Sequence, residues 1–289
     1  MPNTIALAKN YISLLDEVYR NASVTADLTS DGTMVRAGAN ANEIIYPQIS
    51  VTGLGDYDRN SGYTTGAVDL KWKTATFNYD RGTKISVDVM DNEESRNLAF
   101  GAAGATLQRE KVAPEADAFT FATLAGLENI SKVTGEIATA EAFLEALLTA
   151  WSKMDEDEVP AEQRHLYATA TLLNSVMALD TTKSREILGK FAIKKPVPQA
   201  RFYTAIDLLD GKSAGEELGH YKKADTGADI NFMIVHKPAI IKFDKHIASN
   251  IIPASMNADA DADILKYRKY GLVDAYANKR AGIYLHSKA

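Results

Sequence analysis

The first feature that could carry chemistry is a serine flanked by glycines, Ser213, in the run Gly211-Lys212-Ser213-Ala214-Gly215. The run matches the G-x-S-x-G nucleophile elbow, in which a strained turn between a strand and a helix lifts a serine towards an oxyanion hole. An elbow needs a buried strand before it, but Asp210 precedes this run and the stretch 216–219 is a poor helix start. We therefore expect a polar surface loop here and keep a serine hydrolase as a minor alternative.

Motifs for nucleotide and calcium binding are incomplete. A phosphate-binding loop ending at Gly211-Lys212-Ser213 would need a glycine where the chain has Ile206. The run 257–263 alternates aspartates like the start of a calcium loop, but Ile264 and Tyr270 stand where that loop requires glycine and glutamate. We expect a solvated loop at 257–263 and no nucleotide site at 206–213.

The remaining acids and histidines do not form a recognisable catalytic or metal-binding set. Four consecutive acids at 155–158 point in diverging directions and are expected to be a solvated helix end. The chain has no cysteine, which excludes disulfides, thiolate zinc sites, iron–sulfur clusters and cysteine nucleophiles. No HxH or HExxH spacing occurs among the five histidines, His165, His220, His236, His246 and His286. We therefore expect no catalytic residue, no cofactor and no metal, and hence no enzyme.

The overall composition is that of an ordinary globular chain. Its 289 residues are 46% hydrophobic and 24% charged, which indicates one or two domains with a sizeable core. Acidic residues outnumber Lys and Arg by 38 to 32, which argues against a sequence-specific nucleic-acid binder. The N-terminus lacks a secretory signal, and the uncharged run 166–179 is shorter than the roughly 20 apolar residues of a membrane span. We expect a cytosolic, soluble chain.

The N-terminal part is predicted to be an arm. Ile5, Ile12 and Leu15 recur at helical spacing within residues 4–20. The following 25 residues are small, polar and rich in glycine, so the helix is expected to lie at the end of an extended arm. Arms of this kind usually pack on something else.

A long hairpin is predicted next. Residues 44–51 form one strand, the glycine-rich stretch 53–66 forms the tip, and apolar and polar residues alternate in the return strand. The outer half has too few apolar residues to bury on its own chain, which favours docking on a neighbour over a floppy surface hairpin. With the arm helix, the candidates for contacts between subunits are Ile5, Ile12, Leu15, Tyr57, Tyr63, Val68, Leu70 and Trp72.

A strand and a long helix are predicted after the hairpin. The strand covers 85–89, and Asp91 followed by Glu94 resembles a capping box that would start the helix. The helix can run to about residue 124. Pro114 lies inside it and is expected to bend it or divide it in two, because proline removes a backbone donor and clashes with the preceding turn.

The middle of the chain is predicted to be an α/β insertion. Apolar residues at helical spacing define an amphipathic helix over 143–154, and a strand leads into a helix within 166–179. The apolar stretch 230–235 is typical of a strand buried on both faces of a sheet. The tail, 240–289, alternates strands and turns.

This order of elements resembles the major capsid protein of tailed bacteriophages, which has the Hong Kong 97 fold, and is similar to those of phages of Gram-positive hosts. The resemblance spans nearly the whole chain and is carried by these runs: LLDEVYRNASVTADL, GANANEIIYPQISVTGLGDY, FNYDRGTKISVDVMDNEES, VAPEADAFTFATLAG and YRKYGLVDAYANKRAGIYLH.

The resemblance implies an α+β fold built from named parts. They are an N-arm (1–45), a first part of a discontinuous P-domain (46–134) with an extended E-loop (about 50–78) and a long spine helix (about 92–127), an inserted A-domain (135–238), and a second part of the P-domain (239–289).

The resemblance also implies a structural function. Such proteins self-assemble into hexamers and pentamers of an icosahedral phage head that encloses double-stranded DNA. The implied partners are further copies of the chain, a portal protein, packaged DNA contacted non-specifically and, as a further candidate, a decoration protein. No membrane partner is implied.

Some relatives carry a cleaved scaffolding region before the arm. This chain has no room for one there, so a separate scaffolding protein is expected. Other relatives cross-link an E-loop lysine, but no motif assigns that chemistry to Lys71 or Lys73. Assembly would take place in the host cytoplasm, and the mature location would be the virion. The alternatives are an encapsulin-like shell for protein cargo and, less favoured, a serine hydrolase that uses Ser213.

Overall fold

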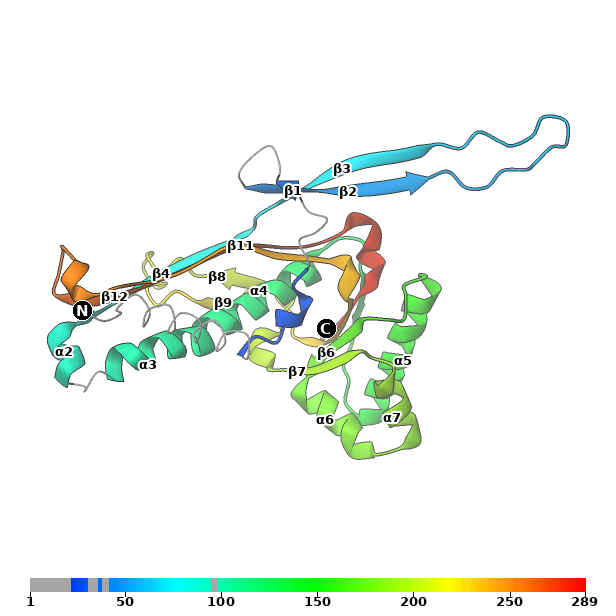
Figure 1. The fold of residues 1–289 in the computed structure, drawn as a ribbon. Coiled ribbons are helices and arrows are strands. Elements are labelled where there is room, and N and C mark those ends of the chain that lie inside the picture. The colour runs from blue at the N-terminus through cyan, green and yellow to red at the C-terminus, as the bar shows by residue number, and fades with distance from the viewer. Residues whose placement is uncertain (1–21, 31–35, 38–41, 95–97) are drawn as a thin grey trace.

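The computed structural model describes residues 22–30, 36–37, 42–94 and 98–289. Within these ranges the chain forms two main sheets, a long helix beside them and a projecting hairpin (Figure 1).

The first sheet is long, narrow and antiparallel. Its strand order is β11 (Ile240–Ile252), β12 (Ala262–Ala275) and β4 (Tyr79–Asp88). Buried side chains recur along the central strand β12, while Lys266 and Arg268 between them are exposed, as expected for a sheet with one face on the core. We call it the long sheet.

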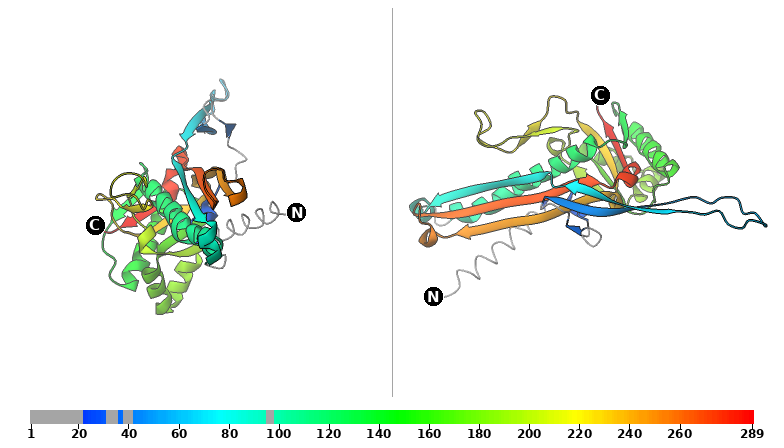
Figure 2. Two further views of the ribbon diagram at one scale, coloured as in Figure 1. Left: turned by 90° about the vertical axis from the view of Figure 1, so that its left-hand side faces the viewer. Right: turned by 90° about the horizontal axis from the view of Figure 1, so that it is seen from above.

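A long helix runs along this sheet. It consists of α3 (Leu98–Thr106), a π-helical stretch (Leu107–Val112) and α4 (Ala113–Gly126), and the short helix α2 (Val89–Glu94) precedes it in the sequence. Figures 1 and 2 show α3 and α4 following one direction along the long sheet. We call the segment Leu98–Gly126 the spine helix.

Two details of this helical region differ from the sequence-based expectation. Helix α2 begins at Val89, three residues before the expected start, because the carboxylate of Asp88 accepts the Met90 N–H at 2.9 Å. Pro114 does not divide the spine helix, since Val112 and Ala113 keep right-handed helical dihedrals. Instead, the turn before it widens into the π-helical stretch, which relieves the clash between the proline ring and the preceding turn.

The second sheet has five strands, three of which (β10, β6 and β7) come from the inserted part of the chain. Its order is β5 (Ser131–Thr134), β13 (Ile283–Ser287), β10 (Ile230–His236), β6 (Arg164–Thr169) and β7 (Ile193–Val197). Every residue of the central strand β10 is buried, as predicted for the stretch 230–235. Strand β13 comes from the C-terminal tail, so the tail contributes to both main sheets.

Helices cover the five-stranded sheet. They are α5 (Ala140–Glu156), α6 (Ala170–Leu179) and α7 (Thr182–Gly189). Helix α5 buries Phe143, Leu147 and Met154 in a cluster with Phe232 of β10, which confirms the amphipathic helix expected there. A small separate hairpin, β8 (Ile206–Leu208) with β9 (Tyr221–Lys223), stands beside the spine helix (Figure 1).

The N-terminal segment 23–30 packs on the core, contrary to the expectation of a weakly packed arm: Ser23, Thr25 and Leu28 are buried, and Thr29 is exposed. Its Leu28 is fully buried in the same cluster as Phe121 and Tyr167. The sequence suggested an arm because this segment is small and polar. It can be buried because its polar groups are bound by residues far away in the chain, of which Asp117 and Lys242 are two.

Candidate functional site

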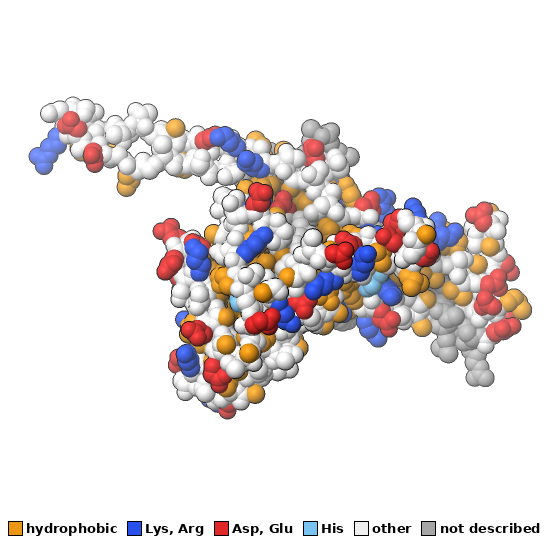
Figure 3. Space-filling model, turned by 180° about the vertical axis from the view of Figure 1, so that it is seen from behind, with side chains coloured by type: hydrophobic (Ala, Val, Ile, Leu, Met, Phe, Trp, Pro, Cys, Tyr) orange, Lys and Arg blue, Asp and Glu red, His pale blue; other side chains and the backbone are white. Residues whose placement is uncertain are grey.

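The most prominent surface feature is the hairpin of β2 (Glu43–Val51) and β3 (Val68–Thr76), which projects past the rest of the molecule in two perpendicular views (Figures 1 and 2). The space-filling view from behind shows the same projection at its upper left (Figure 3). The two-residue β1 (Arg36–Ala37) pairs with β2 at its base. The register places Pro47 opposite Trp72, Ile49 opposite Leu70 and Val51 opposite Val68.

One face of the hairpin is attached to the chain's own core at the base. Ile44, Tyr46 and Ala75 are buried there in a cluster with Ile241 and Leu272 of the long sheet. The Tyr46 ring also packs edge-on against Tyr276, with ring centroids 5.0 Å apart. Farther out, this same face carries polar residues, namely Gln48, Ser50, Asp69, Lys71 and Lys73.

The other face of the hairpin is apolar and open to solvent. Because side chains alternate along a strand and paired residues share a face, one face collects the three apolar pairs of the outer half. Ile49, Val51, Val68, Leu70 and Trp72 are between 46% and 70% exposed. We call the face formed by Pro47, Ile49, Val51, Val68, Leu70 and Trp72 the apolar face.

The half of the apolar face on β2 was not among the residues expected from sequence. The return strand supplied Val68, Leu70 and Trp72, whereas Pro47, Ile49 and Val51 were passed over. Their period-two spacing was the available signal, since Ile45, Pro47, Ile49 and Val51 occupy alternate positions.

The hairpin tip contains local order. Asp58 and Gly62 exchange backbone hydrogen bonds of 3.2 and 2.7 Å, and Gly62 has a positive φ of 81°, which glycine adopts without strain. Tyr57 and Tyr63 lie on either side with ring centroids 4.8 Å apart, and both are largely exposed. The other expected contact residues, Ile5, Ile12 and Leu15, lie outside the described residues.

Ser213 lies in an exposed loop between β8 and β9. Its hydroxyl donates to the Asp210 carboxylate at 2.5 Å, and the same carboxylate accepts the backbone N–H groups of Lys212 and Ser213. The preceding strand is three residues long and only half buried, whereas an elbow requires a buried strand that leads into a helix. This geometry is that of a polar turn and argues against the hydrolase alternative.

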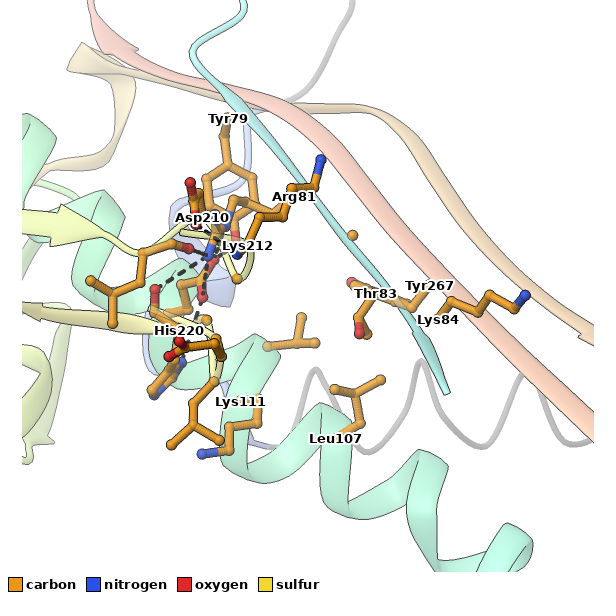
Figure 4. A pocket seen from close by; sticks show the side chains of 18 residues that line it. Tyr79, Arg81, Thr83, Lys84, Leu107, Lys111, Asp210, Lys212, His220 and Tyr267 are labelled. Atoms are coloured by element: carbon orange, nitrogen blue, oxygen red, sulfur yellow. Dashed lines mark hydrogen bonds and ion pairs between the residues drawn. The ribbon is translucent and has the colours of Figure 1, made fainter. Parts of the chain in front are cut away.

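A hollow of about 400 Å³ lies between this loop, β4 and the spine helix (Figure 4). Its floor holds Glu115, which accepts hydrogen bonds from Arg81 at 2.7 Å and from Tyr79 at 3.1 Å and lies 3.5 Å from His220. Burial alone would raise the pKa of Glu115, but hydrogen bonds from His220 and Arg81 outweigh it and hold the pKa below its ordinary value. Arg81 also donates to Leu209 O, so this cluster attaches the loop to the spine helix.

Carboxylates of the two other acidic runs, 155–158 and 257–263, make separate contacts within the chain. Asp155 pairs with Arg164 at 2.6 Å, and Asp157 pairs with Lys153 at 2.6 Å. In the calcium-like run, Asp263 accepts the Ala254 N–H. Among the described residues, no group of three or more carboxylates and histidines is arranged to hold a metal ion. None of the described helices is long and apolar enough to cross a membrane.

Comparison with known proteins places the fold. No family model and no curated relative matches the chain. Solved structures do match over nearly the whole length. A chain of Mycobacterium phage Che8 is 14% identical, with 91% of this chain and 90% of that chain covered and a TM-score of 0.59. A chain from the capsid of Cyanophage P-SCSP1u is 12% identical, with 93% and 88% covered and a TM-score of 0.60. A chain of a virus-like particle from Pyrococcus furiosus is 8% identical, with 96% and 98% covered and a TM-score of 0.59.

These matches confirm the expected fold class. The chain has the mixed α+β fold shared by capsid chains of the Hong Kong 97 type, and the resemblance to tailed-phage capsid proteins holds at the level of three-dimensional structure.

Proposed function

We propose that this chain is a major capsid protein, which self-assembles into hexamers and pentamers of an icosahedral phage head around double-stranded DNA. The observation that carries the proposal is the apolar face, which shows five large side chains at 46% to 70% exposure on a hairpin that extends away from its own core. Monomeric soluble proteins rarely expose a contiguous apolar patch of this kind unless it binds something. A second copy of the chain is the occupant that shell assembly requires.

The division of the chain follows from this proposal. The N-arm, expected over 1–45, would end where β2 begins at Glu43 and would include the packed segment 23–30. The hairpin with its tip would be the E-loop, and Leu98–Gly126 the spine helix. The long sheet would form most of the P-domain. The five-stranded sheet and its helices would form the A-domain, with β13 counted in this unit because it pairs between β5 and β10.

The proposal also specifies partners. A separate scaffolding protein, a portal protein and a decoration protein would act at assembly, and the packaged DNA would be contacted non-specifically. The formal charge of −6 is compatible with a wall that does not itself attract DNA. Assembly would take place in the host cytoplasm, and the final location would be the virion.

An encapsulin-like shell is the second candidate. It is favoured by the likeness to the Pyrococcus furiosus virus-like particle, whose chain is covered over 98% of its length. The two candidates differ in what the shell holds. Mass spectrometry of material that co-purifies with shells would find an abundant enzyme in the cargo case, and nucleic acid or scaffold in the phage case.

Negative-stain microscopy tests the proposal directly. The purified chain is concentrated with and without a candidate scaffolding protein, and closed particles are expected in at least one of the two conditions. A Leu70→Asp variant places a charge on the apolar face and should give folded subunits without particles. Particles of normal yield from this variant would remove the hairpin from the assembly contact.

A further inference from the structure

The segment 23–30 lies where the spine helix, the five-stranded sheet and the long sheet meet, in one apolar cluster that includes Leu28, Phe121, Tyr167 and Ile240. Figure 1 draws it as the dark blue turn between α4 and the five-stranded sheet. Besides the apolar packing of Leu28, the segment forms hydrogen bonds to the spine helix, the inserted part and the long sheet, and each of these three parts is joined to it by at least one charged side chain.

The contact with the spine helix is made by Asp117, a fully buried carboxylate of α4. One carboxylate oxygen accepts the hydroxyls of Ser23 and Thr25, each at 2.7 Å, and the Thr25 N–H at 3.1 Å. The other accepts the Val24 N–H at 2.9 Å and Arg201 Nη1 at 3.1 Å. Arg201 belongs to the inserted part and also donates to Ala22 O.

The contact with the five-stranded sheet is made by Asp27, which belongs to the segment itself. Lys195 of β7 donates to one carboxylate oxygen at 2.8 Å and also to Val24 O at 2.9 Å. The Tyr167 hydroxyl of β6 donates to the other oxygen at 2.8 Å, and His165 Nδ1 lies 2.9 Å from it.

The contact with the long sheet is made by Lys242 of β11. Its buried ammonium donates to Thr25 Oγ1 at 2.6 Å and to Thr25 O at 2.9 Å. Farther along, the Ser30 N–H donates to Lys242 O and the Ser30 hydroxyl donates to Ile240 O. All three structural parts are therefore tied to eight consecutive residues by charge-assisted hydrogen bonds, which are the stronger class.

We propose that residues 23–30 act as an internal latch, which holds the five-stranded sheet at a fixed angle to the spine helix and the long sheet, with Asp117 as its central anchor. Polar ties of this kind are directional, so they specify one relative orientation more sharply than apolar packing does. The latch is a property of the single subunit and does not depend on shell assembly.

The absence of cysteine makes the angle measurable. Met177 on α6 and Ile247 on β11 are both exposed, so each can be replaced by cysteine and spin-labelled. Double electron–electron resonance then reports the distance between the helices that cover the five-stranded sheet and the long sheet. In the unassembled, otherwise unmodified chain we expect one narrow distance distribution. In the Asp117→Asn variant, the side-chain amide cannot accept all five donors, so the distribution should broaden or shift.

Hydrogen exchange of the same samples supplies a second readout. In Asp117→Asn, the backbone amides of residues 23–30 should exchange about tenfold faster or more. The reason is that a buried donor without its acceptor destabilises the closed state by an amount that corresponds to about a tenfold change in the opening equilibrium. Glu115→Gln is the matched control. It alters another buried carboxylate of the same helix, whose hydrogen bonds go to Arg81 and Tyr79 of β4 rather than to the latch. It should leave both the distance distribution and the exchange of 23–30 unchanged.

Two outcomes would overturn the latch. One is a distance distribution in Asp117→Asn that has the same mean and the same width as in the parent chain. The other is an equal change in Glu115→Gln, which would indicate general weakening of the helix. If Asp117→Asn does not fold, Ser23→Ala removes one of the five donors and should give a smaller change in the same direction, and no change at all would count against the latch.

Discussion

Replacing Trp72 by alanine is the sharpest single test of the apolar face. Trp72 is 46% exposed on the hairpin, so roughly 100 Å² of its side chain can still be covered, taking about 250 Å² as the upper area for a tryptophan. At about 25 cal/mol per Å², full coverage by a neighbour would contribute about 2.5 kcal/mol to each contact between subunits. This value lies in the range of interface hot spots.

The expected result is a large effect on assembly and a small one on the subunit. If half of that contribution is realised, the concentration needed to form shells should rise about tenfold, because 1.4 kcal/mol corresponds to a factor of ten. The melting temperature of the unassembled subunit should change little, since the large buried side chains of the core lie elsewhere.

The assay pairs a thermal melt of unassembled protein with sedimentation of shells over a concentration series. Lys73→Ala is the matched control, because Lys73 is the adjacent residue on the opposite face of the same strand. It should leave the assembly threshold near that of the parent chain. A large fall in melting temperature for Trp72→Ala with an unchanged threshold per folded subunit would refute the docking argument.

Three further predictions follow from described contacts. Deleting residues 1–20 should leave a subunit that is folded in circular dichroism melts, because the described hydrogen bonds of the N-terminal part begin at Ala22. The yield of shells should fall. A truncated subunit that is unfolded would contradict this prediction. Ser213→Ala should change the free energy of unfolding by less than about 0.5 kcal/mol, and a fluorophosphonate probe should label neither form. Burial would raise the pKa of Asp27, but hydrogen bonds from His165, Lys195 and Tyr167 hold it below its ordinary 3.8. The parent chain should therefore be more stable than Asp27→Asn at pH 7. In denaturant titrations, this difference in the free energy of unfolding should shrink as the pH falls below about 4. An advantage that stays constant down to pH 2 would contradict the last prediction.

The sequence was informative wherever structure is set by local pattern. Alternation predicted the hairpin, helical spacing predicted α5, and the apolar stretch around Phe232 predicted the buried central strand β10. The exposed side chains of the apolar face were also predictable in kind, because too few apolar residues were available to cover them. In each case the evidence lies within about ten consecutive residues.

The latch was missed because its evidence is not local. Ser23, Thr25 and Asp27 look like a loop. Their partners lie far along the chain, and Thr25 alone binds Asp117, 92 positions away, and Lys242, 217 positions away. Burial of such a polar segment is stable only if distant donors and acceptors meet it in space. A single sequence does not show which of its charged residues will meet.

The response to Pro114 illustrates how tertiary structure can overrule a local rule. A proline inside a helix removes a backbone donor and clashes with the preceding turn, which favours a break. Here the residues on both sides are held by packing, since Ala113 and Phe121 are fully buried and Val112 packs with Tyr267 of the long sheet. A break would expose that surface, whereas widening one turn into a π-helical stretch keeps it buried. The helix therefore absorbs the proline by a change of hydrogen-bond pattern and stays in line with the sheet it covers.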